Sequence, residues 1–250
     1  MLEIAPEIAV IQTLIANAYL VGDAAGWVLV DACTPGNARR IQKAAERRFG
    51  RGSRPRAILL THGHFDHSGS AAGLADAWGV PIFAHSLELP YLTGEASYPP
   101  FDPSAPGFFC RIARFFPIRT MNLGERVSRL EADAAVPGLP DWEIVETPGH
   151  TPGHVAFFRP GDGALLAGDA VTTMNLDSFW DTVRRRKQVC GPPALATMNW
   201  SDAGLSVERL AGLRPTLIAA GHGAPMRNAA DELAGLARHF TPPAKSFFAT

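Results

Sequence analysis

The stretch Leu59-Leu60-Thr61-His62-Gly63-His64-Phe65-Asp66-His67-Ser68-Gly69 carries the clearest signal in this sequence. Within six residues it places four potential metal ligands, which are His62, His64, Asp66 and His67. In an extended chain, side chains two residues apart project to the same side, so His62 and His64 can bind one ion together. Where the chain then turns into a helix, Asp66 and His67 point elsewhere and can bind a second ion nearby. Imidazole and carboxylate groups suit divalent cations, so the stretch predicts a metal site.

Three further candidate ligands each follow an apolar strand and a glycine. They are His150 after residues 144–149, Asp169 after residues 165–168, and His222 after residues 217–221. Glycine lets the backbone turn sharply and approach a metal closely. Ligands at the ends of several strands meet on one edge of the sheets, as sites in α/β architectures commonly do. The sequence therefore predicts that seven side chains converge.

The rest of the chain alternates predicted strands and helices. Strands are expected at residues 8–14, 18–22, 27–32, 56–60, 80–84, 142–147, 155–159, 164–167 and 216–220. Helices are expected from a cap at Asn37 to residue 49, and at residues 68–78, 203–213 and 229–240. This alternation indicates βαβ units and a substantially parallel sheet in an α/β protein.

Length and composition fit one domain over residues 1–250 with a sizeable core, because 46% of the residues are hydrophobic and 19% charged. The net charge of −1 argues against nucleic acid as a partner, and the basic run 184–187 is interpreted as a solvated face. No apolar run is long enough for a membrane span, and the N-terminus lacks the basic and apolar pattern of an export signal. A cytoplasmic location is therefore expected. The three cysteines are expected to be buried free thiols: Cys33, Cys110 and Cys190.

A segment rich in proline and aromatic residues, at about 88–140, interrupts the pattern. Two interpretations stay open, namely a lid over a site or a surface loop that packs its own aromatic side chains. With two residues that follow Asp169, its phenylalanines could form an apolar wall for a lactone or ester with a hydrophobic arm. They could equally belong to the core or to a homodimer contact. These residues are Phe101, Phe108, Phe109, Phe115, Phe116, Phe179 and Trp180.

The motifs THGHFDHSG, TPGHTPGH, LLAGDA and AAGHG occur in this order, and together they resemble the metallo-β-lactamase-fold hydrolase superfamily from about residue 20 to residue 225. The resemblance implies an αββα four-layer sandwich, in which two mixed β-sheets are flanked by helices and hold a binuclear site at one edge. It also implies that His62, His64 and His150 bind the first metal. Asp66, His67 and His222 would bind the second, with Asp169 bridging both.

The presence of Asp169 beside Asp66 and His67 resembles the glyoxalase-II and lactonase branch of the superfamily. Lactamases of this fold usually lack the bridging aspartate, and many use a cysteine ligand, so antibiotic hydrolysis is not expected. The implied cofactors are two divalent ions, zinc first, with iron or manganese as alternatives. The implied reaction is attack of a metal-bound hydroxide on a small ester, lactone or thioester, with Asp66 as a catalytic proton shuttle to the leaving group.

Three alternatives remain open at this point. One is an oxidoreductase resembling persulfide dioxygenases, which use a single iron on this fold; another is a β-lactamase or phosphoesterase; the third is a ligand-binding protein without turnover. The expected partner is a small-molecule substrate, without nucleic acid or membrane. Asp31 is a candidate hydrogen-bond partner of a ligating imidazole, or else a turn residue. His85 and His154 could line the site or be structural.

Overall fold

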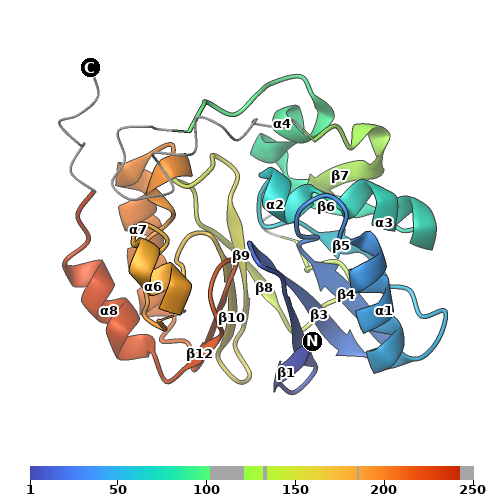
Figure 1. Ribbon diagram of the computed structural model, residues 1–250, viewed down its shortest axis with the longest axis horizontal. Helices are drawn as coiled ribbons and strands as arrows, with labels where there is room; N and C mark the ends of the chain where they lie inside the picture. Colours follow the sequence, from blue (N-terminus) through green and yellow to red (C-terminus); the bar gives the residue numbers. More distant parts are fainter. Residues whose placement is uncertain (102–120, 132–133, 185, 243–250) are drawn as a thin grey trace.

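Two β-sheets face each other in the computed structural model of this chain, and helices cover their outer faces (Figure 1). The structure describes residues 1–101, 121–131, 134–184 and 186–242. Helices α1 to α4 lie on one side of the paired sheets and α6 to α8 on the other (Figure 1). This is the αββα sandwich of two mixed sheets that the motifs imply, so the expected fold class is confirmed.

The first sheet has the strand order β1-β2-β3-β4-β5-β6-β7. Its first four strands form an antiparallel meander, and β4 to β7 then run parallel to one another. The strands are β1 Leu2–Ala5, β2 Ile8–Gln12, β3 Asn17–Asp23, β4 Gly26–Val30, β5 Ile58–Leu59, β6 Ile82–His85 and β7 Val127–Leu130.

The second sheet has the order β12-β11-β10-β9-β8 and is antiparallel except between β10 and β11. Its strands are β8 Glu143–Glu146, β9 Val155–Arg159, β10 Ala164–Gly168, β11 Leu217–Ala220 and β12 Met226–Arg227. The α-helices are α1 Ala38–Phe49, α2 Phe65–Ser68, α3 Ala71–Trp78, α4 Leu89–Thr93, α6 Phe179–Arg184, α7 Trp200–Gly212 and α8 Ala230–Arg238. Short 3-10 helices are η1 Ser86–Glu88, η2 Gly124–Arg126 and η3 Ala194–Ala196.

Alternation along the strands divides the core into three apolar layers. In β2, Ile8 and Val10 face the second sheet, whereas Ala9 and Ile11 face the helices of the first. The middle layer includes Phe157, which is fully buried, and burying a side chain of this size stabilises the fold by about 1.5–3 kcal/mol. The outer layers bury α1 and α3 on one sheet, and α7 and α8 on the other.

The strand ends that precede the candidate ligands come together at one edge of the sandwich. Two backbone hydrogen bonds join the sheets there: the Val155 N–H donates to the Thr61 carbonyl at 2.9 Å, and the Asn17 N–H donates to the Gly221 carbonyl at 2.8 Å. Because these bonds attach directly to the loops after β5 and β11, the edge is fixed by the backbone itself.

Most expected elements are present, with three differences. The helix expected at 68–78 begins later, as α3 at Ala71, and a separate short helix, α2, ends at Ser68. The helical backbone is interrupted at Ser70, which has φ −103° and ψ 1° and whose hydroxyl donates to the Thr34 carbonyl at 2.7 Å. Asn37 does precede α1, but the expected side-chain cap is wrong: its amide donates to Thr34 instead of accepting from the helix. Strands β1, β7 and β12 were not predicted.

Part of the segment at 88–140 belongs to the first sheet, since β7 pairs with β6. Another part forms α4, whose Leu92 is buried in the core. Phe108, Phe109, Phe115, Phe116 and Cys110 lie outside the described residues, so the lid and the apolar wall stay predictions there. Cys33 is a buried free thiol as expected, and Cys190 is a partly buried one.

None of the helices in the described part of the chain has the length and apolar character that a bilayer crossing requires.

Candidate metal centre

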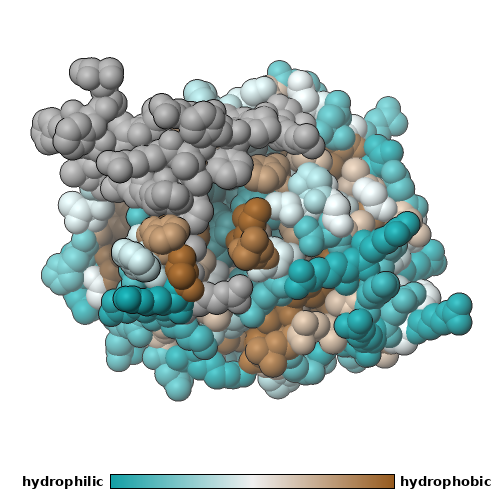
Figure 2. All heavy atoms as spheres, in the orientation of Figure 1, coloured by the Kyte–Doolittle hydropathy of each residue, from teal (hydrophilic) through white to brown (hydrophobic). Residues whose placement is uncertain are grey.

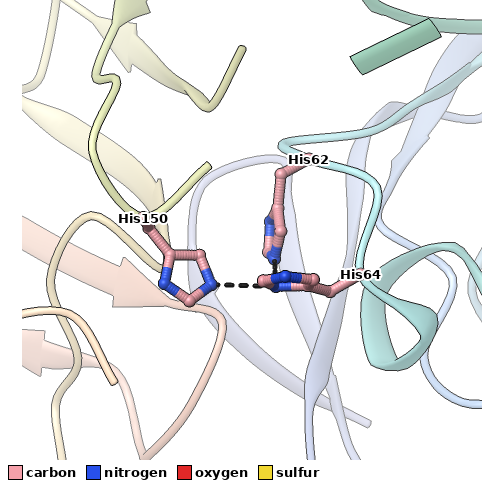
Figure 3. Close-up of side chains that lie close together, drawn as sticks. All are labelled: His62, His64 and His150. Carbon is pink, nitrogen blue, oxygen red and sulfur yellow. Dashed lines mark hydrogen bonds between the residues drawn. The ribbon is translucent and has the colours of Figure 1, made fainter. Parts of the chain in front are cut away.

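The first group of candidate ligands joins two loops from different sheets (Figure 3). His62 and His64 follow β5, and His150 follows β8. The Nδ1 atom of His64 lies 3.0 Å from the Nε2 atom of His62 and 3.0 Å from the Nε2 atom of His150. The three rings point toward one another, and we call them the imidazole group.

The second group, which we call the carboxylate group, lies beside the first and contains Asp66, His67, His222 and Asp169. The Nε2 atom of His222 is 3.5 Å from Asp66 Oδ2 and 3.1 Å from Asp169 Oδ2. The Nε2 atom of His67 is 3.8 Å from Asp66 Oδ2 and 3.5 Å from Asp169 Oδ1. Asp169 also reaches the imidazole group, because its Oδ2 atom lies 3.5 Å from His150 Nε2. The structure therefore brings all seven side chains together, and their binding of metal ions stays a prediction.

Gly221 shows why a glycine precedes His222. A Cβ atom at this position would lie 2.1 Å from Asp169 Oδ1 and 2.5 Å from His67 Cε1, so no other residue fits without displacing two candidate ligands. Close backbone approach at the site therefore depends on this glycine.

The far side of the ligating rings is held by hydrogen bonds. The Asp31 carboxylate lies 2.8 Å from His67 Nδ1 and accepts from the Thr61 N–H at 2.9 Å. The Ile15 carbonyl accepts from His222 Nδ1 at 2.7 Å. Such partners fix the orientation and tautomer of a ligating imidazole. Asp31 therefore has the contact proposed for it from the sequence, and it holds a left-handed backbone with φ of 59° while doing so.

His154 and His85 have different positions. His154 is buried behind the centre, where its Nε2 atom accepts from the Asp169 N–H at 2.9 Å and its Nδ1 atom lies 2.7 Å from Thr147 Oγ1. It therefore orients Asp169 from behind. His85 precedes η1 and lies 3.1 Å from the Glu146 carboxylate, and it is in none of the candidate ligand groups of the described chain.

Burial and charge separate the two groups electrostatically. Burial lowers the pKa of His62 and of His150 well below the usual value, and lowers the pKa of His64 to about 4. Burial also acts on His67, but three neighbouring carboxylates outweigh it and raise the pKa of His67 to about 10. For Asp169, burial is outweighed by the nearby imidazoles of His222 and His67, which hold its pKa well below the usual range.

The residues fit bound cations. His67 Nε2 and Asp169 Oδ1 are buried and have no hydrogen-bond partner in the described chain, although buried polar atoms are normally paired. In the imidazole group, three ring nitrogens meet at 3.0 Å spacing, where their lone pairs repel unless a proton or a cation lies between them. A cation in each group would satisfy these atoms, and imidazole with carboxylate is a donor set suited to zinc, iron or manganese.

Sequence reasoning missed Glu88, which is fully buried and accepts a hydrogen bond from the Gly63 N–H, between His62 and His64. Burial raises the pKa of Glu88 despite several hydrogen bonds to its carboxylate. A charged residue inside an otherwise apolar run, Leu87-Glu88-Leu89, was the available signal. Its partners are backbone groups far away in the chain, so no local pattern could identify them.

The chain matches the family model for the metallo-beta-lactamase superfamily over residues 11–222, and it belongs to this superfamily. The resemblance identified from the motifs is thus confirmed. The superfamily includes metal-dependent hydrolases, and the two groups above contain residues of the described part of the chain that could hold metal ions.

Named relatives span most of the chain. The probable metallo-hydrolase YflN of Bacillus subtilis is 39% identical over 233 residues, which cover 91% of this chain and 88% of the relative. A hydroxyacylglutathione hydrolase of Xanthomonas campestris is 32% identical over 204 residues, covering 81% of this chain and 58% of the relative. Among solved structures, TTHA1623 in a di-iron-bound form is 28% identical, with a TM-score of 0.63 and coverage of 92% of this chain and 96% of that one.

Proposed function

We propose that this protein is a binuclear metal-dependent hydrolase that cleaves a small, uncharged carboxylic ester, lactone or thioester. The observation that carries the proposal is the arrangement of the ligand groups. The three imidazoles of the first group lie on one side of Asp169, and the other members of the carboxylate group lie on the other side. Asp169 is within 3.5 Å of a ring nitrogen on each side. Zinc is the first candidate ion, and a di-iron form of one structural relative makes iron the second.

Two bound divalent cations would polarise a carbonyl oxygen and lower the pKa of a water. The chain supplies the remaining functions. Asp66 is the most exposed member of the carboxylate group, with 15% of its side chain accessible, and it can accept a proton and pass it to the leaving group. Asp31 keeps His67 in a fixed tautomer, and His154 keeps Asp169 between the two groups.

The pocket beside His64 supports an uncharged acyl group. Among the described residues that line it, none carries a formal charge; they are His64, Phe65, Tyr98, Pro99, Phe101, Ala196 and Met198. Aromatic and thioether side chains bind apolar groups well and leave a carboxylate or phosphate without a partner. An acyl group next to His64 would therefore meet uncharged side chains, and an apolar group is favoured over an acidic one.

Apolar side chains are also exposed on helix α6. Phe179 and Trp180 on α6 are 40% and 64% exposed, and apolar side chains gather over α6 on the face shown in Figure 2. Exposed apolar groups of this size often contact a ligand or partner. They support a hydrophobic arm on the substrate. The name of the Xanthomonas relative, a hydroxyacylglutathione hydrolase, supports a thioester as one form of the scissile bond.

The experiment that tests the proposal is a substrate panel with zinc-replete protein. It compares neutral esters and lactones of increasing acyl length with thioesters, phosphoesters and β-lactams, and measures zinc and iron per chain. We expect anaerobic hydrolysis of an apolar ester, lactone or thioester with two metal ions per chain, and a fall of more than about a hundredfold in His64→Ala and Asp169→Ala. Equal rates in the parent and both variants would refute the assigned site. A single iron with oxygen-dependent sulfur oxidation would instead identify a dioxygenase.

A further inference from the structure

Glu88 is a buried carboxylate whose two oxygens accept hydrogen bonds from different parts of the chain. Its Oε1 atom accepts from the Gly153 N–H at 2.7 Å. Its Oε2 atom accepts from the Gly63 N–H at 2.8 Å and from the Tyr98 hydroxyl. No described lysine or arginine is ion-paired with it, so backbone and hydroxyl donors alone compensate its burial. A buried carboxylate is retained only where such donors are fixed.

The two backbone donors lie in the two loops that build the imidazole group. Gly63 lies between His62 and His64, and Gly153 lies in the turn that connects His150 with β9. These loops come from different sheets, so Glu88 connects them across the edge of the sandwich. Glu88 thus adds a second connection between the His62–His64 loop and the His150 loop, beside the backbone hydrogen bond from Val155 to Thr61.

Both glycines are required by the close approach of this cluster. A Cβ atom on Gly63 would lie 2.3 Å from the Tyr98 hydroxyl, and a Cβ atom on Gly153 would lie 2.9 Å from Glu88 Cγ. The glycine inside the His62-Gly63-His64 motif therefore has a role apart from turning the chain. It lets Glu88 and Tyr98 reach the backbone between two candidate ligands.

Tyr98 links the same cluster to the substrate pocket. Its ring centroid lies 4.5 Å from that of His64, and it stacks on Tyr91 at 4.1 Å with an interplanar angle of 7°. The ring also lines the pocket beside His64. The hydroxyl of Tyr98 thus contacts the Glu88 carboxylate, and its ring lines the pocket beside His64.

We propose that Glu88 is a positioning residue that holds the two loops of the imidazole group at ligating distance, with Tyr98 orienting its carboxylate. We call these two residues, with Gly63 and Gly153, the Glu88 bridge. One consequence of this inference, a higher affinity of the imidazole group for its cation, rests on the proposed metal function. Its structural part, the coupling of the two loops, stands independently.

The test compares Glu88→Gln with Glu146→Gln. Glutamine offers one oxygen and one NH2 group, so at position 88 an NH2 must face a backbone N–H and one of the two loops is released. Glu146 is a half-exposed carboxylate that contacts His85 and neither glycine, and it is the matched control. Two quantities are measured: zinc affinity by chelator competition, and hydrogen exchange of the loop amides in the metal-free protein.

We expect Glu88→Gln to weaken the binding of one of two zinc ions about tenfold or more, since outer partners of ligands have effects of this size. Exchange should become faster in the loop that is released, at Gly63 or at Gly153, and Glu146→Gln should match the parent in both measurements. Tyr98→Phe keeps the ring and removes the hydroxyl, so it should weaken zinc binding by between about two- and tenfold. Tyr91→Phe should leave zinc affinity unchanged.

Parent-like zinc affinity and exchange in Glu88→Gln would overturn the proposal. If Glu88→Gln does not fold, Tyr98→Phe decides: faster exchange at the Gly63 loop supports the bridge, and unchanged exchange overturns it. A parent that binds zinc but cleaves no ester, lactone or thioester would refute the proposed function and leave the bridge intact. A parent that binds neither zinc nor iron would also refute that function, while the exchange comparison would still decide the bridge.

Discussion

The two ligand groups of the metal centre lie side by side but differ in charge. The imidazole group has neutral rings, because burial lowers the pKa values of His62, His64 and His150. The carboxylate group has two acids beside His67 and His222, and these acids raise the pKa values of both imidazoles. An ion in the carboxylate group would therefore have two acidic ligands but would have to displace protons from two imidazoles, whereas an ion in the imidazole group would meet rings that are already neutral.

The two groups also differ in the hydrogen bonds that hold their imidazole rings. In the carboxylate group, His67 and His222 are each held by a strong acceptor at 2.8 Å or less, the Asp31 carboxylate and the Ile15 carbonyl. In the imidazole group, His62 and His150 have hydroxyl partners at 3.0 and 3.3 Å, from Thr61 and Thr197. The comparison indicates that the carboxylate group is the more firmly organised of the two, and that the imidazole group relies on coupled loops.

The largest effect is expected from Asp169→Asn, which removes the charge shared by both groups. We expect both ions to bind more weakly and hydrolysis to fall by more than about a hundredfold, because even outer partners of ligands contribute ten- to hundredfold. Metal analysis after dialysis, together with initial rates, measures this. Two tightly held ions in the variant would show that Asp169 bridges nothing.

His64→Ala and His222→Ala should separate the groups. Each removes one ligand from a different group, so each variant is expected to retain about one ion per chain, with the more firmly held ion remaining in His64→Ala. Competition with a graded series of chelators measures the affinity of the remaining ion. The comparison fails if the ion left in His222→Ala is the tighter one.

Asp31→Asn should weaken the carboxylate group alone. Loss of the charged acceptor at His67 Nδ1 is expected to lower the affinity for that ion about ten- to hundredfold. Thr197→Val removes the longer contact to His150 and is the control in the imidazole group. It should lower the affinity for the ion in that group by a smaller factor. Equal losses in the two variants would contradict the difference in support.

The smallest effect is expected from Met198→Ala in the pocket beside His64. The variant should bind both ions like the parent, while KM for an apolar ester rises about fourfold for each buried methylene-sized contact that is lost, at about 0.8 kcal/mol each. Leu205→Ala is a matched control, since Leu205 is an exposed aliphatic residue on α7 outside the pocket lining. A KM unchanged across acyl lengths would remove the pocket from substrate binding.

Several strands and helices were predictable because their hydrophobic patterns are visible in their own residues. The strand β9 Val155–Arg159 has the bounds expected from its apolar run, and helix α1 ends at Phe49 as its amphipathic pattern predicts. The strands β1 Leu2–Ala5 and β12 Met226–Arg227 were missed, since short edge strands are specified by their neighbours rather than by their own residues. The interruption of the helix at Ser70 was also missed, because the Ser70 hydroxyl donates to the carbonyl of Thr34, which is distant in the chain.

The sequence alone determined the seven candidate ligands and the strand ends that carry them, because ligand type, spacing and alternation are local properties of a chain. Tertiary structure alone decided which atoms face each other. Asp169 meets both groups, Asp31 meets His67, and Glu88 joins Gly63 to Gly153 only after two sheets have packed. Hydrogen bonds to backbone atoms distant in the sequence leave no pattern in the residues that accept them, so their partners become known only in the folded chain.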